Sequence, residues 1–63
     1  MKILHEVKIG GGTLQIIDDG EDGYYVALQA PDGRYDADDG PYNTEEEARE
    51  IFEKWLKREE ERP

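Results

Sequence analysis

The sequence predicts a small α+β domain: an antiparallel β-meander of three, or four, strands followed by one C-terminal α-helix packed on one face. Three observations carry this prediction. Apolar and polar residues alternate in three segments between residues 2 and 30, turn-forming residues separate these segments, and residues 44–58 have helical apolar spacing behind a capping motif. Consecutive strands with short connections pair as neighbours. We therefore expect a single domain over residues 1–63, with a frayed tail at 59–63.

Residues 2–9 and 13–18 are the first two predicted strands. Period-two alternation with β-branched residues is typical of a half-buried strand. In "KILHEVKI" one face carries Ile3, His5, Val7 and Ile9, and the other carries Lys2, Leu4, Glu6 and Lys8. In "TLQIID" one face carries Leu14 and Ile16, and the other carries Thr13, Gln15 and Ile17. The intervening "GGG" supplies the conformational freedom for a chain reversal.

Residues 24–30 are the third predicted strand. Tyr24, Val26 and Leu28 share one face of "YYVALQA", and Tyr25, Ala27 and Gln29 share the other. The following "PDGR" is typical of a turn, because proline presets φ and glycine supplies a left-handed position. A short fourth strand is predicted around Arg34–Ala37. Its acidic continuation "DADDG" favours a ragged edge at best.

Residues 44–58 carry the clearest helix signal. Thr44 and Glu47 form a capping box, Glu45 and Glu46 lie at the positive end of the helix dipole, and basic residues follow near the other end. The apolar stripe consists of Ala48, Ile51, Phe52, Trp55 and Leu56. Because one helix covers one sheet face, we expect this stripe on the face carrying Val7, Ile9, Leu14, Ile16, Tyr24, Val26 and Leu28. Trp55 and Phe52 are its largest members, so Trp55→Ala is expected to unfold the domain.

The charge balance restricts the partners. There are 17 acidic and 8 basic residues, a net charge of −9. Such a surface repels nucleic acid and anionic lipid and favours basic partners. A merely solvating surface, a halophilic origin or an engineered origin gives the same balance. The chain has no apolar run long enough for a bilayer and no signal peptide at its N-terminus, so we expect a soluble, cytoplasmic protein without a membrane partner.

The residues needed for common enzyme mechanisms are missing. With no cysteine, no serine and one histidine, the chain cannot assemble a Ser/His or Cys/His nucleophile. His5 has no second histidine to share a metal and is expected at the sheet margin. The glycines match neither phosphate-binding nor dinucleotide motifs. We therefore expect no enzymatic activity, no catalytic or metal-binding residue, no cofactor and no small-molecule substrate.

The stretch "DDGEDG" at residues 18–23 has some features of a calcium loop. Asp18, Asp22 and Gly23 fit the first, fifth and sixth positions of such a loop, but Gly20 and Gln29 stand where two further carboxylates are required. Aspartates and glycines are also the ordinary residues of tight turns. We therefore predict a hairpin connection at this point.

The order of sheet, "DGRY" and "GPYNTEEEAREIFEKWL" resembles the arm-type N-terminal domain of tyrosine integrases and several small bacterial three-strand–helix domains. The resemblance covers residues 13–57 and lies in Gly33, Tyr35, Tyr42, Thr44, Glu47, Ala48 and Trp55. It implies the same sheet-plus-helix architecture. In the integrase domains the exposed sheet face enters a DNA groove with basic side chains; here acidic loops flank that face, so we expect a protein partner.

The uncovered sheet face is the candidate interaction face. It is predicted to carry Leu4, Glu6, Lys8, Gln15, Ile17, Tyr25 and Ala27. A contiguous apolar patch on such a face marks an interface. The favoured function is a non-enzymatic protein-interaction or structural module, with a basic protein or a second copy as partner. The alternative is an acidic mimic of nucleic acid, of the anti-restriction or anti-CRISPR type, that binds a basic nucleic-acid-binding protein.

Overall fold

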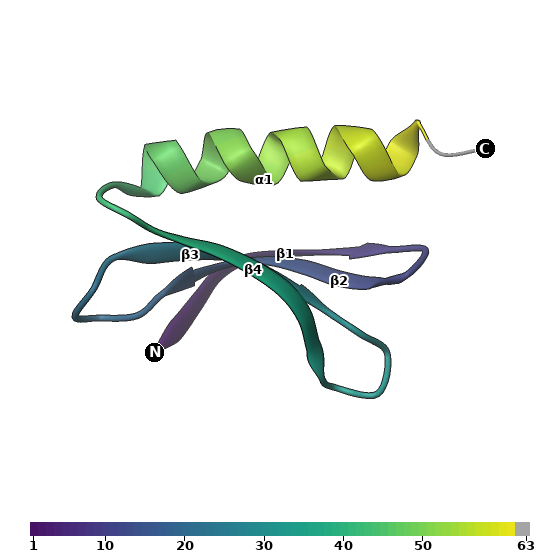
Figure 1. Cartoon of the computed structure of the whole chain (residues 1–63), viewed down its shortest axis with the longest axis horizontal. Coiled ribbons are helices and arrows are strands. Elements are labelled where there is room, and N and C mark those ends of the chain that lie inside the picture. Colours follow the sequence, from purple (N-terminus) through teal and green to yellow (C-terminus); the bar gives the residue numbers. More distant parts are fainter. Residues whose placement is uncertain (62–63) are drawn as a thin grey trace.

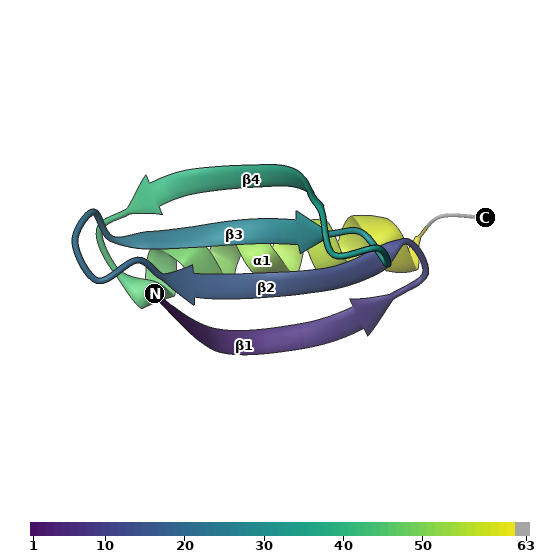
Figure 2. The same cartoon turned by 90° about the horizontal axis from the view of Figure 1, so that it is seen from below.

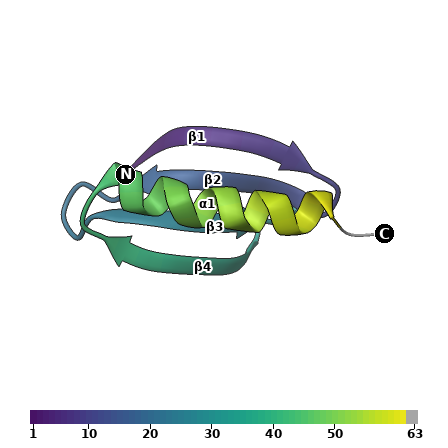
Figure 3. The same ribbon diagram turned by 90° about the horizontal axis from the view of Figure 1, so that it is seen from above.

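The computed structural model describes residues 1–61 as a four-stranded antiparallel sheet with one helix on one face (Figure 1). The strands are β1 (Lys2–Ile9), β2 (Gly12–Asp18), β3 (Tyr24–Gln29) and β4 (Tyr35–Tyr42), and the helix is α1 (Glu45–Glu60). The strand order β1-β2-β3-β4 confirms the predicted meander and α+β class. Seen from the helix side, α1 lies over the central strands β2 and β3 (Figure 3).

A β-bulge in β1 changes which residues face the helix. Ile3 pairs with Ile17 and His5 pairs with Ile16, so Leu4 has no partner in the ladder. A bulge inserts one residue, and each one-residue step moves a side chain to the opposite face. Leu4 accordingly packs against the core, and Ile3 takes the uncovered face. The prediction that placed Leu4 on the uncovered face is wrong for this reason.

Strand β4 is longer than its composition predicts. It continues through "DADDGPY" to Tyr42 and pairs with β3 along this length, with register shifts near both ends. Its residues before Tyr42 are all exposed. The pairing of its backbone with β3 therefore stabilises the strand, although its side chains bury little surface. Pro41 fits here because an edge strand tolerates the loss of one N–H donor.

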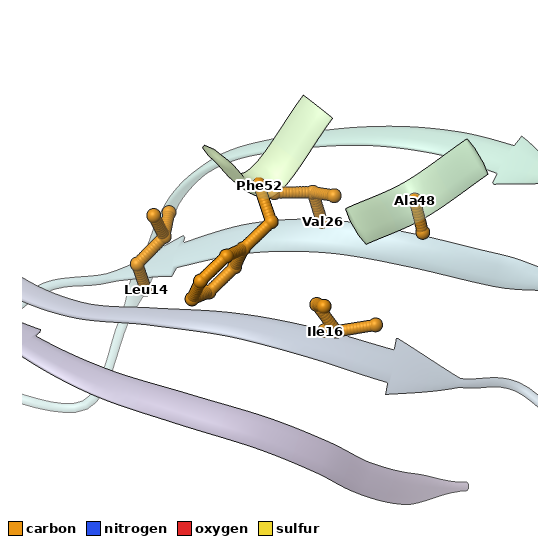
Figure 4. Packing of buried hydrophobic residues seen from close by; sticks show 5 residues of the cluster. All are labelled: Leu14, Ile16, Val26, Ala48 and Phe52. Atoms are coloured by element: carbon orange, nitrogen blue, oxygen red, sulfur yellow. The ribbon is translucent and has the colours of Figure 1, made fainter. Parts of the chain in front are cut away.

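The core lies between the helix and the two central strands. Leu14, Ile16, Val26, Ala48 and Phe52 are its buried residues (Figure 4). Around them pack the partly buried Leu4, Val7, Ile9, Tyr24, Leu28, Tyr42, Ile51, Trp55 and Leu56. The predicted core face and helix stripe are thus confirmed. Phe52 is completely buried, whereas Trp55 is only partly buried at the margin.

The helix begins where the capping motif predicts. The Thr44 hydroxyl oxygen accepts a hydrogen bond from the Glu47 backbone N–H (3.2 Å), and the same hydroxyl lies 3.3 Å from the Glu47 carboxylate. At the other end the helix continues to Glu60, and the N–H of Glu61 bonds to the Lys57 carbonyl (3.0 Å). The helix therefore includes 59 and 60, which the sequence predicts to fray. Glu61 is the C-cap, and the last two residues of the predicted tail, 62–63, lie outside the described residues.

Candidate interaction surface

The sheet face opposite the helix is uncovered, and its residues follow from the strand register (Figure 2). Directly paired residues of antiparallel strands project to the same face. The pairs on this face are Ile3–Ile17, Glu6–Gln15, Lys8–Thr13, Gln15–Ala27, Ile17–Tyr25, Ala27–Asp38 and Gln29–Tyr35. Six of the seven predicted face residues therefore lie here, and Leu4 does not. The open face has two parts, one polar and one apolar.

The first zone is a polar network centred on Gln15. Gln15 is only 1% exposed, and its Nε2 donates to Glu6 Oε2 (2.9 Å) and to Gln29 Oε1 (3.3 Å). The Tyr35 hydroxyl donates to Gln15 Oε1 (3.0 Å). One residue from each strand therefore takes part. Because a buried amide is costly unless its hydrogen bonds are made, the network stabilises the alignment of the four strands and leaves Gln15 little capacity for a partner.

The second zone is an apolar depression with a volume of about 340 Å³. It is lined by Met1, Ile17, Asp19, Asp22, Tyr25, Ala27, Tyr35 and Asp38. Ile17 and Ala27 form its floor, since they are 6% and 2% exposed although no helix covers this side. Side chains of neighbouring strands must therefore cover them. Tyr25, Tyr35 and Met1 line the same depression, and Ile3 pairs with Ile17, so these side chains are in position to do so.

Tyr35 extends across the sheet surface. Its backbone pairs with Gln29 of β3, yet its hydroxyl reaches Gln15 of β2. Neighbouring strands are about 4.8 Å apart, so the side chain has to cross over β3 to make this bond. Tyr35 is nevertheless 46% exposed. One side of its ring therefore faces the sheet and the other faces solvent.

The rim of the depression is acidic. Burial raises the pKa of Tyr25, and the carboxylates of Asp22, Asp19 and Asp38 raise it further. Within residues 1–61 none of these three aspartates forms an ion pair, because the ion pairs present lie in the 31–34 turn and on the helix. The depression thus combines an apolar floor, two aromatic side chains and three aspartates that form no ion pair within residues 1–61.

The 18–23 stretch is the hairpin connection that the sequence predicts. Asp18 Oδ1 accepts from the Gly20 N–H (2.9 Å), and the Asp19 N–H donates to the Gly23 carbonyl (2.9 Å). The Asp22 N–H approaches Asp19 Oδ2 at 3.4 Å. These carboxylates thus satisfy the backbone of their own turn. No group of three or more potential metal ligands occurs among residues 1–61.

The remaining candidate residues lie away from the depression. The His5 ring is on the helix side, with its centroid 5.1 Å from that of Phe52 in an edge-on contact. Lys8 is on the open face beside Thr13, at the opposite end of the strands from the acidic rim. Sequence reasoning missed Tyr35 and Asp38, because both belong to the strand that was predicted to be ragged. The sequence carries no signal for their shared face, because it depends on a bulge in the pairing of β4 with β3.

The ionisation of Tyr42 is expected to make the stability of the protein depend on pH. Its hydroxyl donates to Asp39 Oδ2, and this hydrogen bond, with burial, raises the pKa of Tyr42 from 10.0 to about 12. The pKa of Tyr42 is higher in the folded protein than in the unfolded chain, so protonated Tyr42 stabilises the fold. This contribution to stability is complete below pH 10 and is lost as the pH rises through about 12. We expect Asp39→Asn to lower the midpoint of Tyr42 ionisation, followed through its ring NMR signals, and Asp36→Asn to leave it unchanged. Equal midpoints in wild type and Asp39→Asn would contradict the assignment.

The helix within residues 1–61 lacks the length and apolarity required to cross a membrane. Comparison of the chain with protein-family models, with curated proteins and with solved structures finds no match.

Proposed function

We propose that this chain is a non-enzymatic, cytoplasmic protein-interaction module that binds a basic segment of a partner protein on its open sheet face. The apolar depression, with three rim aspartates that form no ion pair in the described part of the chain, is the observation that supports this proposal. Apolar surface favours contact with a partner, and the acidic rim selects a positively charged one. The polar network beside it fixes the alignment of the strands that carry the site.

Long-range charge supports the same partner. The turn between β2 and β3, the later part of β4 and the start of α1 lie at one end of the molecule (Figures 1 and 2). These segments carry Asp18, Asp19, Glu21, Asp22, Asp38, Asp39, Glu45, Glu46 and Glu47. Lys54, Lys57 and Arg58 lie toward the other end of the helix. Acidic residues outnumber the basic Lys2 and the amino terminus at this end. The resulting negative field accelerates the approach of a positively charged partner, and salt weakens it.

The direct test is an amide NMR titration of the protein with a short peptide of alternating lysine and serine. We expect the peptide to shift the amide signals of Tyr25, Ala27 and Asp38, and added salt to weaken the effect. The matched peptide of alternating glutamate and serine should leave them unchanged. Shifts confined to the helix, or no shifts with the lysine peptide, would refute the proposal.

A protein variant locates the site on the open face. Ile17→Asp adds a further negative charge but removes the apolar floor, so we expect weaker binding despite the favourable charge. Glu53→Gln, on the exposed side of the helix, serves as the control and should bind the peptide as the wild type does. A thermal melt of each variant establishes whether it is folded, because Ile17 is only 6% exposed and a carboxylate at this position costs stability. Unchanged binding by a folded Ile17→Asp protein would contradict a role of the floor.

The second candidate function is an acidic mimic that occupies the nucleic-acid site of a basic protein. The gathering of acidic segments at one end of the molecule favours it. Displacement of DNA or RNA from basic nucleic-acid-binding proteins tests this function. The mimic requires that Asp19→Asn combined with Glu21→Gln weakens displacement strongly and that Ile17→Asp does not. If Ile17→Asp weakens displacement more than the Asp19→Asn and Glu21→Gln double variant does, the result favours binding of a basic segment on the open sheet face.

A further inference from the structure

We infer that the apolar depression is a subsite for one lysine or arginine side chain of the basic segment. Its aliphatic stem lies in the depression over Ile17 and Ala27, against the tyrosine side chains that line it, and its charged head lies between the Tyr35 ring and the Asp38 carboxylate. This inference rests on the proposed function, because it assumes that a basic segment binds the open face. It adds that one cationic side chain of the partner is recognised specifically, and that it binds in this depression.

The floor suits the stem of such a side chain. Lysine and arginine have apolar methylene chains that pack on apolar surface while the charged head remains near water. Ile17 and Ala27 lie on adjacent strands at the base of the depression and are nearly inaccessible. The apolar surface that a stem contacts is therefore mainly that of Tyr25 and Tyr35, which line the same depression. A depression of about 340 Å³ that is open to solvent accommodates a side chain of this kind without a deep pocket.

The rim suits the charged head. Asp38 pairs directly with Ala27, so its carboxylate starts from the strand position beside the floor. Tyr35 stands on the same face of the same strand, and the outer side of its ring is open. Cations bind favourably over the face of a tyrosine ring, and a carboxylate adds charge attraction. An apolar side chain of the partner would displace water from the Asp38 carboxylate without forming a hydrogen bond or ion pair in its place, which is unfavourable. An acidic side chain would be repelled by the same carboxylate.

Gln15 is a positioning residue for this subsite. The Tyr35 hydroxyl donates to Gln15 Oε1 at 3.0 Å, and the Gln15 amide is fixed in turn by Glu6 and Gln29. The ring is therefore held across β3 before a partner arrives. Binding to a ring that is already in place loses less conformational entropy than binding to a mobile one.

The test uses the alternating lysine–serine peptide and a matching arginine–serine peptide. In the complex we expect ring-current upfield shifts of the side-chain methylene protons next to the charged group, and NOEs from the side-chain methylene protons to the Tyr35 and Tyr25 rings. Tyr35→Leu should abolish the upfield shifts and weaken binding about two- to fivefold. Tyr35→Phe retains the ring but loses its hydrogen bond to Gln15, so the upfield shifts should persist at reduced size. The peptide with the lower dissociation constant identifies the preferred cation.

A matched pair of charge variants tests the carboxylate. Asp38→Asn is expected to weaken binding about two- to fivefold. Asp36→Asn makes the same change of charge on the same strand, but Asp36 does not line the depression, so its effect should be smaller. Thermal melts of all variants establish that they are folded.

The outcomes separate the subsite from the proposed function. One outcome rejects the subsite alone: the lysine peptide shifts open-face amides but shows no upfield methylene shifts, and Asp36→Asn weakens binding as much as Asp38→Asn. The proposed binding of a basic segment to the open face would then remain supported. If neither basic peptide shifts open-face amides, both fail. Methylene shifts that depend on Tyr35, together with a selective effect of Asp38→Asn, support both.

Discussion

Phe52→Ala is expected to unfold the protein at room temperature. Phe52 is 0% exposed and lies at the centre of the core, between Leu14, Ile16 and Val26 (Figure 4). Truncation of a buried phenylalanine to alanine costs about 3–5 kcal/mol. The core of a chain this short rarely supplies more than about 3–5 kcal/mol of stability, so the loss equals what is available. Loss of the cooperative thermal transition in circular dichroism is the expected measurement.

Trp55→Ala is the control variant for Phe52→Ala. The sequence alone predicts that Trp55→Ala also unfolds the domain, because tryptophan is the largest residue of the apolar stripe. In the structure Trp55 is partly exposed at the margin of the core, where it borders a depression that is also lined by Leu28 and Ala37. We therefore expect Trp55→Ala to lower the melting temperature but to keep a cooperative transition. A Phe52→Ala protein that melts above Trp55→Ala would contradict this ranking.

Gly12→Ala is expected to destabilise the protein by at least about 2–3 kcal/mol. Gly12 has φ +146°, a region that other residues avoid, and a Cβ atom at this position would lie 2.0 Å from the Gln29 carbonyl oxygen. That oxygen belongs to the backbone of β3, so the first residue of β2 would have to move away from its neighbour. Urea unfolding gives the measurement, as a lower midpoint for the variant.

Gly11→Ala is the matched control for this prediction. Gly11 lies next to Gly12 in the same "GGG" turn, but its φ is outside the left-handed region, and a Cβ atom at Gly11 would have no neighbouring atom within 4 Å. The change is expected to shift stability by less than about 1 kcal/mol. Equal effects at Gly11 and Gly12 would show that the turn, and not the contact with β3, determines the cost.

The candidate surface was predictable in part. Ile17, Tyr25 and Ala27 follow from the alternation of two regular strands, and the structure places all three at the depression. Gln15 and Glu6 also lie on the predicted face, but they bond to each other, which alternation cannot show. A hydrogen bond between side chains depends on register and on rotamers, and neither is a property of one strand.

Tyr35 and Asp38 show why the remainder of the surface was missed. Their strand has few apolar residues, so its pattern carries no signal of burial, and only the pairing with β3 identifies its extent. The bulge between them then brings both residues to the open face, which simple alternation from Tyr35 would not do. Both features arise from contact with a neighbouring strand.

Elements with local causes were predictable from the order of the amino acids. Strand alternation, turn residues and the Thr44–Glu47 cap act over a few neighbouring positions, so the meander, the hairpin at 18–23 and the start of the helix all followed from them. The bulge at Leu4, the length of β4 and the position of Tyr35 over β3 emerged only in the folded chain. These depend on pairing between segments distant in the chain, where the backbone of one strand sets the conformation of the next.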